Sequence, residues 1–373
     1  MHARPDPHPA TDAPPSRWTG EAGRAMRGMP HLSIRPGLHL LCRLFGHTPA
    51  DIAVKAADQW EVAPPGVVRV RPARMLPGQI DRIRGSEFAP LAEVLRDFAG
   101  GFDSLQPSTT AFRLRDVLLI DGMLYAGNAA RHLRARTSRM PIGIAPREIV
   151  RASFYESWVG NRWFGNWLSD DCLTYRLAEA AGGPVTTNPP SGHMGAYERG
   201  LGMAPSRMSA ALFEELILFD DRSHNDGKRA RAGDMRRRLV GPEPKHHPGT
   251  FLLRGGTGAR RVLRNERAIA EHLAARRGFR VLDPSSASLE EIVRDCAGAR
   301  VIAGVEGSHL VHGLMLMPPG ATALVIQPPT RAVSALKLLT DRQGQDYSLV
   351  VGVGSDESFD AGIGEIERTL DLG

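Results

Sequence analysis

The sequence predicts an α/β protein of two domains, the second of which contains a doubly wound parallel sheet. Strand-like and helix-like segments alternate from residue 250 to residue 351, which is typical of parallel strands with helices on both faces. The 373-residue chain is longer than one ordinary domain, and its hydrophobic content of 42% suffices for sizeable cores. Residues 1–50 are expected to be disordered or to form an extension, residues 51–235 to form the first domain and residues 236–373 the second.

The first domain is expected to open with a strand at Val67–Arg71 and an amphipathic helix at Glu87–Phe98. Two apolar runs follow, at Phe112–Ile120 and Met123–Ala126, and Asp121-Gly122 separates them. An Asp-Gly pair between strands favours a type I′ turn. The two runs are therefore predicted to form a β-hairpin.

A longer helical pattern covers Phe164–Ala181 and ends at a Gly-Gly-Pro sequence. A short strand at Val185–Thr187, a helix near Met194–Leu201 and a strand at Glu215–Phe219 are expected after it. Residues 220–248 are polar, basic and punctuated by Gly and Pro. This composition predicts a linker or a mobile loop between the two domains.

The second domain has the more regular pattern. Its five expected strands are Thr250–Leu253, Arg280–Leu282, Arg300–Ala303, Ala323–Ile326 and Ser348–Val351. Helices are expected to begin near Asn265, Ser288, Ser308 and Val333, with a last helix at Ile363–Leu370. Ser288 and Glu291 have the spacing of a capping box, which supports a helix start there.

The turn after the third of these strands suits a phosphorylated ligand. Glu306-Gly307-Ser308 separates the strand from an apolar helical pattern that runs to Met317. A glycine lets the backbone approach a ligand, and a helix start directs N–H groups and a positive dipole end toward it. Three arginines, Arg254, Arg260 and Arg261, follow another strand of the same sheet. Because α/β sheets bind ligands beyond the carboxyl ends of their strands, we predict a phosphate or diphosphate site, first of all for a nucleotide.

Charge and cysteine usage exclude several other classes. The net charge of +6 is concentrated in residues 222–245 and 254–280, but no basic motif with interleaved aromatic residues accompanies it, so nucleic acid is not expected as a partner. The three cysteines are scattered, which fits a reducing compartment and argues against structural zinc. No apolar run reaches the length of a membrane span. A dehydrogenase is not expected either, because no Gly-x-Gly-x-x-Gly follows a strand.

Three segments share motifs with one known family. Residues 163–177 read WFGNWLSDDCLTYRL, residues 260–266 read RRVLRNE, and residues 299–321 read ARVIAGVEGSHLVHGLMLMPPGA. In this order they resemble glycosyltransferase family 61, whose motifs are Phe-Gly-His-Trp-Leu-x-Asp/Glu, Arg-Arg-x-Leu/Ile-x-Asn-Glu, and a strand and glycine turn before Phe/Leu-Met-Pro-Pro-Gly. The resemblance covers residues 109–335. The chain departs from the family at Asn166, where members commonly have His, and at residues 306–309, where many have His-Gly-Ala-Gly.

The resemblance implies a GT-B-like fold, in which two Rossmann-like domains face a cleft. It implies inverting transfer of a hexosyl or pentosyl group from a nucleotide-sugar donor to a glycan or lipid-linked glycan acceptor. No metal or other cofactor is implied, and the sequence contains no Asp-x-Asp. The implied setting is the bacterial cytoplasm, in capsular or other extracellular polysaccharide assembly. A peripheral contact with the inner membrane through the apolar segment Leu38–Phe45 stays open, beside packing of this segment within the protein.

The catalytic residues are expected on the helix predicted at Phe164–Ala181. Inverting transfer needs a base beside the acceptor hydroxyl. Asn166 cannot take a proton, but Asp170 lies four residues on and therefore on the same helix face. We expect Asp170 to be the base and Asp171 to be the second candidate. The alternative is that both are surface acids of an amphipathic helix.

The donor is expected to contact residues from both sequence motifs of the second domain. These are Arg254, Arg260, Arg261, Asn265, Glu306, Gly307, Ser308, His309 and His312. The arginines would bind the diphosphate, Glu306 the ribose or acceptor side, and Gly307 and Ser308 the phosphate. The two histidines are three residues apart and would line the site without holding a metal, because no third ligand is spaced with them. For Asn265, plain helix capping is an equal alternative.

Two other functions stay open at this point. One is a degenerate, non-catalytic family member that binds a nucleotide or glycan as an assembly partner, which Asn166 in place of His favours. The other is a different nucleotide-sugar enzyme, such as an epimerase, on the same architecture. Transfer would give a new glycoside, epimerisation a changed donor, and the degenerate form neither.

Overall fold

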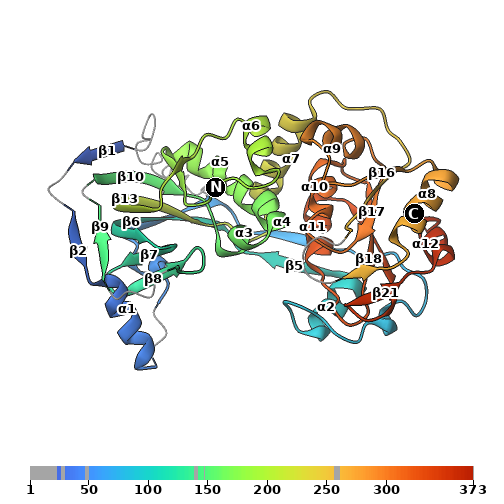
Figure 1. The fold of residues 1–373 in the computed structure, drawn as a ribbon, viewed down its shortest axis with the longest axis horizontal. Helices are drawn as coiled ribbons and strands as arrows, with labels where there is room; N and C mark the ends of the chain where they lie inside the picture. The colour runs from blue at the N-terminus through green and yellow to red at the C-terminus, as the bar shows by residue number, and fades with distance from the viewer. Residues whose placement is uncertain are drawn as a thin grey trace, which may run out of the picture.

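The computed structural model describes residues 23–26, 30–46, 50–137, 142–146, 148–255 and 261–372. Two large sheets are separated by a layer of helices, with the N-terminal sheet on the left of Figure 1 and the C-terminal sheet on the right. Strands and helices are mixed throughout, so the predicted α/β class is confirmed.

The N-terminal sheet is built around a long antiparallel pair. Its order is β12 (Ser206–Arg207), β11 (Pro184–Thr186), β10 (Glu148–Phe154), β13 (Ala210–Asp220), β6 (Thr109–Ile120), β7 (Met123–Ala126) and β8 (Ala129–His132), with β1 (Gly23–Met26) on β10 and β3 (Asp58–Ala63) on β6. Asp121 and Gly122 have φ values of 48° and 71°. Both positive angles are those of a type I′ turn, so the predicted hairpin between β6 and β7 is confirmed.

Helices from the same half cover the side of this sheet that faces the C-terminal half (Figure 1). They are α3 (Trp158–Arg162), α4 (Phe164–Asn166), the π-helical turn η3 (Trp167–Asp171), α5 (Cys172–Ala181), α6 (Met194–Leu201) and α7 (Asp226–Val240). The helix predicted at 164–181 therefore forms, but one turn of it is wound as π-helix. Such turns insert one residue into a helix and are frequent at functional sites.

The linker predicted at residues 220–248 is wrong, because Asp226–Val240 forms helix α7. Asn225 caps this helix, and its side chain accepts a hydrogen bond from the Lys228 backbone N–H at 3.0 Å. Lys228, Ala232 and Met235 are buried at helical spacing. Because the segment contains many arginines, its composition did not indicate this short stripe of buried residues.

The C-terminal sheet is parallel throughout. Its order is β16 (Arg280–Leu282), β14 (Thr250–Leu252), β17 (Val301–Val305), β18 (Thr322–Gln327) and β19 (Asp346–Val351). The helices that follow the strands are α8 (Glu266–Arg277), α9 (Leu289–Cys296), α10 (Leu310–Leu316), α11 (Ala335–Gln343) and α12 (Ile363–Leu370). The five predicted strands and the capping box at Ser288 are confirmed.

Alternate residues of these strands pack on opposite faces. Phe251, Ala303 and Leu324 belong to a core that α8 and α12 complete. Their neighbours Leu252, Ile302 and Ala323 belong to a core shared with α9, α10 and α11. Helices thus cover both faces, which confirms the doubly wound sheet predicted for this half.

One N-terminal segment crosses to the C-terminal half. It contains β4 (Gly66–Val70), β5 (Phe102–Gln106), η2 (Ile80–Arg82) and α2 (Leu91–Ala99). Phe98 stacks on Tyr347 of β19 with ring centroids 5.9 Å apart, and Arg74 exchanges backbone hydrogen bonds with Tyr347 and Leu349 at 2.8 and 2.9 Å. The division into domains at residue 236 stays a prediction.

The remaining elements are small. A three-stranded sheet of β15 (Val262–Leu263), β21 (Ser358–Asp360) and β20 (Val353–Gly354) lies in the C-terminal half, and η1 (Ile52–Lys55) contacts β8. At the left edge of Figure 1, β2 (His31–Ser33) pairs with β9 (Gly143–Ala145), next to α1 (Arg35–Leu44). Within the described ranges, no helix has both the length and the apolar character needed to cross a membrane.

Candidate active site

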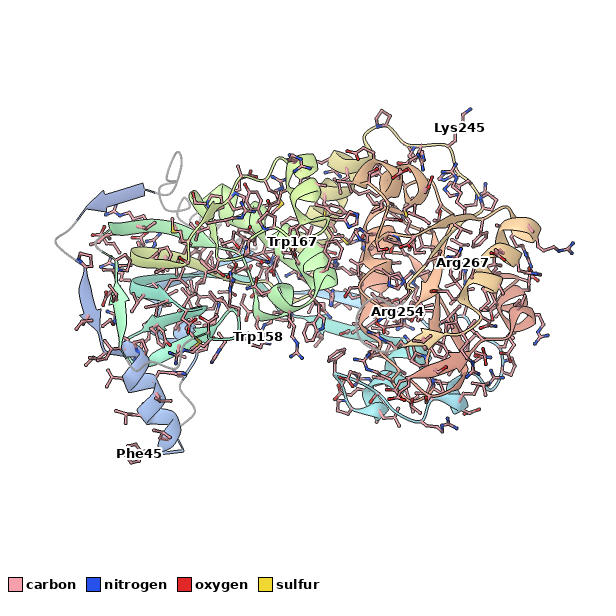
Figure 2. All side chains as sticks on the ribbon, in the orientation of Figure 1. Phe45, Trp158, Trp167, Lys245, Arg254 and Arg267 are labelled. Carbon is pink, nitrogen blue, oxygen red and sulfur yellow. The ribbon has the colours of Figure 1, made fainter. Side chains whose placement is uncertain are left out.

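The strand order of the C-terminal sheet reverses between β14 and β17. Such a reversal leaves a crevice beyond the carboxyl ends of the two strands, where open α/β sheets bind ligands. Arg254 follows β14 and Glu306 follows β17, and Nη1 of Arg254 donates to the Glu306 carbonyl oxygen at 3.3 Å. Two of the residues predicted for the donor site therefore meet at this crevice. Figure 2 labels Arg254.

Cationic groups dominate the crevice. Arg261 forms an ion pair with the Glu306 carboxylate and donates to its carbonyl oxygen at 3.2 Å. Burial, together with the nearby charges of Arg254 and Arg331, lowers the pKa of Arg261 to about 9. Burial also lowers the pKa of Arg254. Guanidinium groups that have lost water and repel one another are stabilised by an anion that binds between them.

Arg331 is a member of this cluster that the sequence analysis missed. It follows β18, the next strand of the sheet, and is only 14% exposed. Its Nε lies 3.5 Å from Glu87, and its guanidinium carbon lies 5.7 Å from the centre of the Phe88 ring. The rule that selected Arg254, namely an arginine in the turn after a parallel strand, would have selected Arg331 as well.

Three nitrogen atoms of the crevice are buried and have no hydrogen-bond partner among the described residues. They are Nε of Arg261, Nη1 of Arg331 and Nε2 of His309. Buried polar atoms almost always have a partner, so three such atoms in one place indicate a position for a polar ligand or ordered water. Burial lowers the pKa of His309 to about 3, with help from Arg254 and Arg261. Its imidazole is therefore neutral near pH 7.

The loop between β14 and α8 is held by the predicted Asn-Glu pair. The Glu266 carboxylate accepts hydrogen bonds from the backbone N–H groups of Arg254 and Gly255, at 2.8 and 3.0 Å. The Asn265 side chain donates to the Ala361 carbonyl at 2.8 Å and accepts from its N–H at 3.3 Å. Glu266 thus positions the loop that presents Arg254, and Asn265 fixes the start of α8 to Ala361. Arg260, also predicted, lies outside the described residues.

Gly307 lies in close contact with the arginine cluster. A Cβ atom at this position would lie 2.1 Å from Nη1 of Arg254, so any other residue would displace that guanidinium. Ser308 lies on the other side of the turn and packs against Gly165 of α4. A Cβ added to Gly165 would lie 3.1 Å from Oγ of Ser308. The turn after β17 is therefore packed between Arg254 and the N-terminal half. Helix α10 begins at Leu310, two residues later than predicted.

His312 lies apart from His309, although both were predicted to line the phosphate site. Its Nδ1 is 2.8 Å from the Tyr197 hydroxyl, and its ring centre is 4.6 Å from that of Phe164. Burial lowers the pKa of His312 well below its usual value. His312 therefore joins α10 to α4 and α6 as part of an aromatic cluster.

Asp170 lies in the π-helical turn and has several partners. Its Oδ1 accepts from Nζ of Lys228 at 2.5 Å, and its Oδ2 accepts from Asn166 Nδ2 at 3.2 Å and from Ser169 Oγ at 3.0 Å. Burial opposes its ionisation, but the charges of Lys228 and Arg342 outweigh burial and lower the pKa of Asp170. The side chain is 26% exposed, so the ionised carboxylate retains access to solvent.

Asp171 has a different environment from its neighbour. Its oxygens accept from the Ser157 hydroxyl at 2.7 Å and from the Ser157 backbone N–H at 3.1 Å, at the start of α3. The residue is 2% exposed, and burial raises its pKa well above the ordinary value. The contacts of Asp171 thus fix α3, and a bound acceptor has no direct route to it.

A buried charge network surrounds Asp170, and sequence analysis identified only one of its members. Lys228 of α7 also donates to the Asp221 carbonyl at 2.7 Å, while Arg231 donates to the Asp221 carboxylate at 2.6 Å. Arg342 of α11 is fully buried and lies 3.7 Å from Asp170. The network joins α7, η3 and α11, which come from both halves of the chain.

We expect Lys228→Met to destabilise the protein by about 3–5 kcal/mol, because it removes the buried ammonium group of the network and leaves the partly buried Asp170 without its closest cation. Urea unfolding of the variant and the parent chain measures this difference. Lys245→Met is the matched control, since Lys245 is exposed and should change the free energy of unfolding by less than about 0.5 kcal/mol. Equal midpoints for the two variants would show that the network adds nothing to stability.

A pocket of about 280 Å³ opens where α3 and α4 meet the loop before α6. Its lining residues are Gly160, Asn161, Arg162, Trp163, Phe164, Ser191, Gly192, His193 and Met194. The Trp163 ring packs edge-on against Phe88 at 5.3 Å, and Arg331 covers that same Phe88 ring. The pocket and the arginine crevice are therefore joined through one aromatic contact.

Of Trp158, Trp163 and Trp167, only Trp163 lines this pocket. Trp167 is 3% exposed and belongs to the core, and Trp158 packs against His132 at 5.9 Å. The Arg162 guanidinium lies 4.6 Å from the Trp163 ring centre, as in a cation–π pair. No cluster of three or more His, Cys, Asp or Glu side chains suited to a metal occurs in the described ranges.

Comparison with known proteins gives one clear result. The sequence model of the family described as Glycosyltransferase 61 matches residues 104–325, which is more than half of the chain. The matched span runs from β5 into β18 and includes Asp170, Arg254, Arg261 and Glu306, whereas Arg331 and Arg342 lie beyond it. No curated protein matches the chain.

Proposed function

The chain belongs to glycosyltransferase family 61, and we propose that it moves a sugar from a nucleotide sugar to a glycan acceptor with inversion, without a metal ion. The proposed arrangement is GT-B-like, with the donor on the C-terminal half and the acceptor on the helices of the N-terminal half. The observation that carries the donor site is the crevice at the strand reversal, where Arg254 and Arg261 both contact Glu306 and the charge of Arg331 lies close by.

The arginines supply what the leaving group needs. When the glycosidic bond to the nucleotide breaks, negative charge develops on the diphosphate. Arg254, Arg261 and Arg331 are already desolvated and directed into one crevice, so stabilising this charge requires little rearrangement. The neutral ring of His309 lies beside Gly307 and Arg254 and can donate a hydrogen bond to a phosphate or ribose oxygen.

The acceptor is proposed to bind in the pocket at Trp163. A sugar presents C–H groups on one face, which pack on an indole ring, while its hydroxyls bond to polar groups at the rim. Asn161, Ser191 and His193 provide such groups around the pocket. We propose a glycan or lipid-linked glycan of capsular or other extracellular polysaccharide as the acceptor class.

Asp170 is proposed as the base that receives the acceptor proton. A base must be deprotonated to act, and the pKa of Asp170 lies below the ordinary aspartate value. Transfer is therefore expected to hold its rate as the pH is lowered from about 8 to about 5, whereas a histidine base would lose activity near its usual pKa of about 6.5. A pH–rate profile that declines around that value would contradict the assignment to Asp170.

Product analysis tests the whole proposal. The full chain would be incubated with a panel of nucleotide sugars and glycan acceptors, without added metal, and the products would be separated by mass and by anomeric configuration. A new glycoside of inverted configuration is the expected result. A changed donor sugar without a glycoside would indicate epimerisation instead, and an unchanged mixture from folded protein would contradict the proposal.

A further inference from the structure

The edge of the molecule farthest from the C-terminal half, on the left of Figure 1, carries an apolar surface that no described residue covers. We call it the apolar tip, and its members are Leu32, Ile34, Leu38, Leu41, Leu44, Phe45, Ile142 and Ile144, with exposed fractions of 44–77%. Helix α1 projects from the body of the protein in Figure 1, and Phe45 lies at its free end in Figure 2. Exposed apolar residues that are contiguous mark interaction sites, whereas single ones are normal on any surface.

Two elements build the tip. In the β2–β9 pair, Leu32 lies directly opposite Ile144. Because side chains alternate along strands, Ile34 and Ile142 share that face. Helix α1 begins at the next residue, Arg35, so the sheet face and the helix are continuous along the chain.

The apolar face of α1 is directed outward. Leu38 and Leu41 are spaced by one helical turn and are about half exposed, while Pro36 and His39 face inward and are buried. The helix is anchored at its base, where Nη1 of Arg35 donates to the Asp116 carbonyl at 2.8 Å. An amphipathic helix normally buries its apolar face in its own core, so this orientation needs a partner outside the described part of the chain.

Charge identifies the kind of partner. Residues 22–50 contain four arginines and no aspartate or glutamate, and only one of these arginines, Arg35, has a described acidic partner, Asp116, so the segment remains cationic. An apolar helix face within a cationic segment is the recognition pattern for an anionic lipid surface, in which such a helix lies parallel to the plane. We propose that the apolar tip docks this protein on membranes that contain anionic phospholipids.

Vesicle co-sedimentation of the full chain tests this docking. Vesicles of phosphatidylcholine with phosphatidylglycerol should bind the protein, vesicles of phosphatidylcholine alone should bind it more weakly, and added salt should reduce the difference. The triple variant Leu38→Glu, Leu41→Glu, Leu44→Glu should lower binding by about tenfold or more, because it removes the apolar face and adds negative charge.

A second triple variant adds the same charges elsewhere. Leu105, Val353 and Leu372 are 83%, 66% and 49% exposed and lie outside the tip, so their change to Glu should lower vesicle binding much less. Thermal unfolding checks that both variants are folded. Anionic vesicles that bind the tip variant as well as the parent would overturn the proposal. The proposal would also be overturned if the parent chain did not bind vesicles and instead formed a dimer that the tip variant, but not the control variant, disrupts.

Discussion

Replacing Arg254 with alanine is expected to weaken nucleotide binding by about a hundredfold or more. Arg254 is 7% exposed, and its guanidinium contacts the carbonyl of Glu306 at the point where the strand order reverses. In the variant, a diphosphate bound there would lose the cation that contacts Glu306. The repulsion between the diphosphate and the Glu306 carboxylate would then be less well compensated. The loss should therefore exceed that of a surface contact, which salt and water screen.

Calorimetric titration with the best-bound nucleoside diphosphate measures this loss. Arg267→Ala is the matched control, because Arg267 is an exposed residue of α8 and its removal changes the net charge equally. Arg254→Lys should restore part of the affinity, since an ammonium keeps the charge but not the forked geometry. If Arg254→Ala and Arg267→Ala bound the nucleotide with equal affinity, the crevice could not be the donor site.

The second large effect is expected for Asp170→Asn, which should lower the rate of sugar transfer by about a hundredfold to ten-thousandfold and leave nucleotide affinity intact. The asparagine keeps the shape of the side chain but cannot take the proton of the acceptor hydroxyl. Initial rates at saturating donor, together with a nucleotide titration, measure the two quantities separately.

Because Asp170 also pairs with Lys228, its replacement affects stability, and a control must separate the two roles. Asp221→Asn serves this purpose. Asp221 belongs to the same network through Arg231, Thr109 and Thr174, but it is only 6% exposed, against 26% for the Asp170 side chain. A similar loss of transfer in both variants, at a temperature where both are folded, would show that Asp170 acts through structure alone.

Much of the C-terminal half could be predicted because its signals are local. Strand–helix alternation, the capping box at Ser288 and the turn at Gly307 each involve a few neighbouring residues. The strand order is different in kind, since it depends on which strands pair across the sheet. The reversal between β14 and β17, which places Arg254 beside Glu306, therefore became visible only in the structure.

The errors at the site have equally specific causes. His309 and His312 were predicted to line the phosphate site together, but the His312 ring packs against Tyr197 and Phe164 from elements far away in the sequence. Lys228 was placed in a linker, and its partner Asp170 is 58 residues away in the sequence. Contacts of this kind, between elements that lie far apart in the chain, have no local sequence pattern by which they could be predicted.

Titration of the full, unmodified chain with UDP, GDP, ADP and CMP in the absence of metal tests the central claim most directly. If the crevice between β14 and β17 is the donor site, one of these nucleotides should bind saturably with one site per chain. No binding of any of them, by protein shown to be folded, would contradict the donor site and with it the proposed transfer.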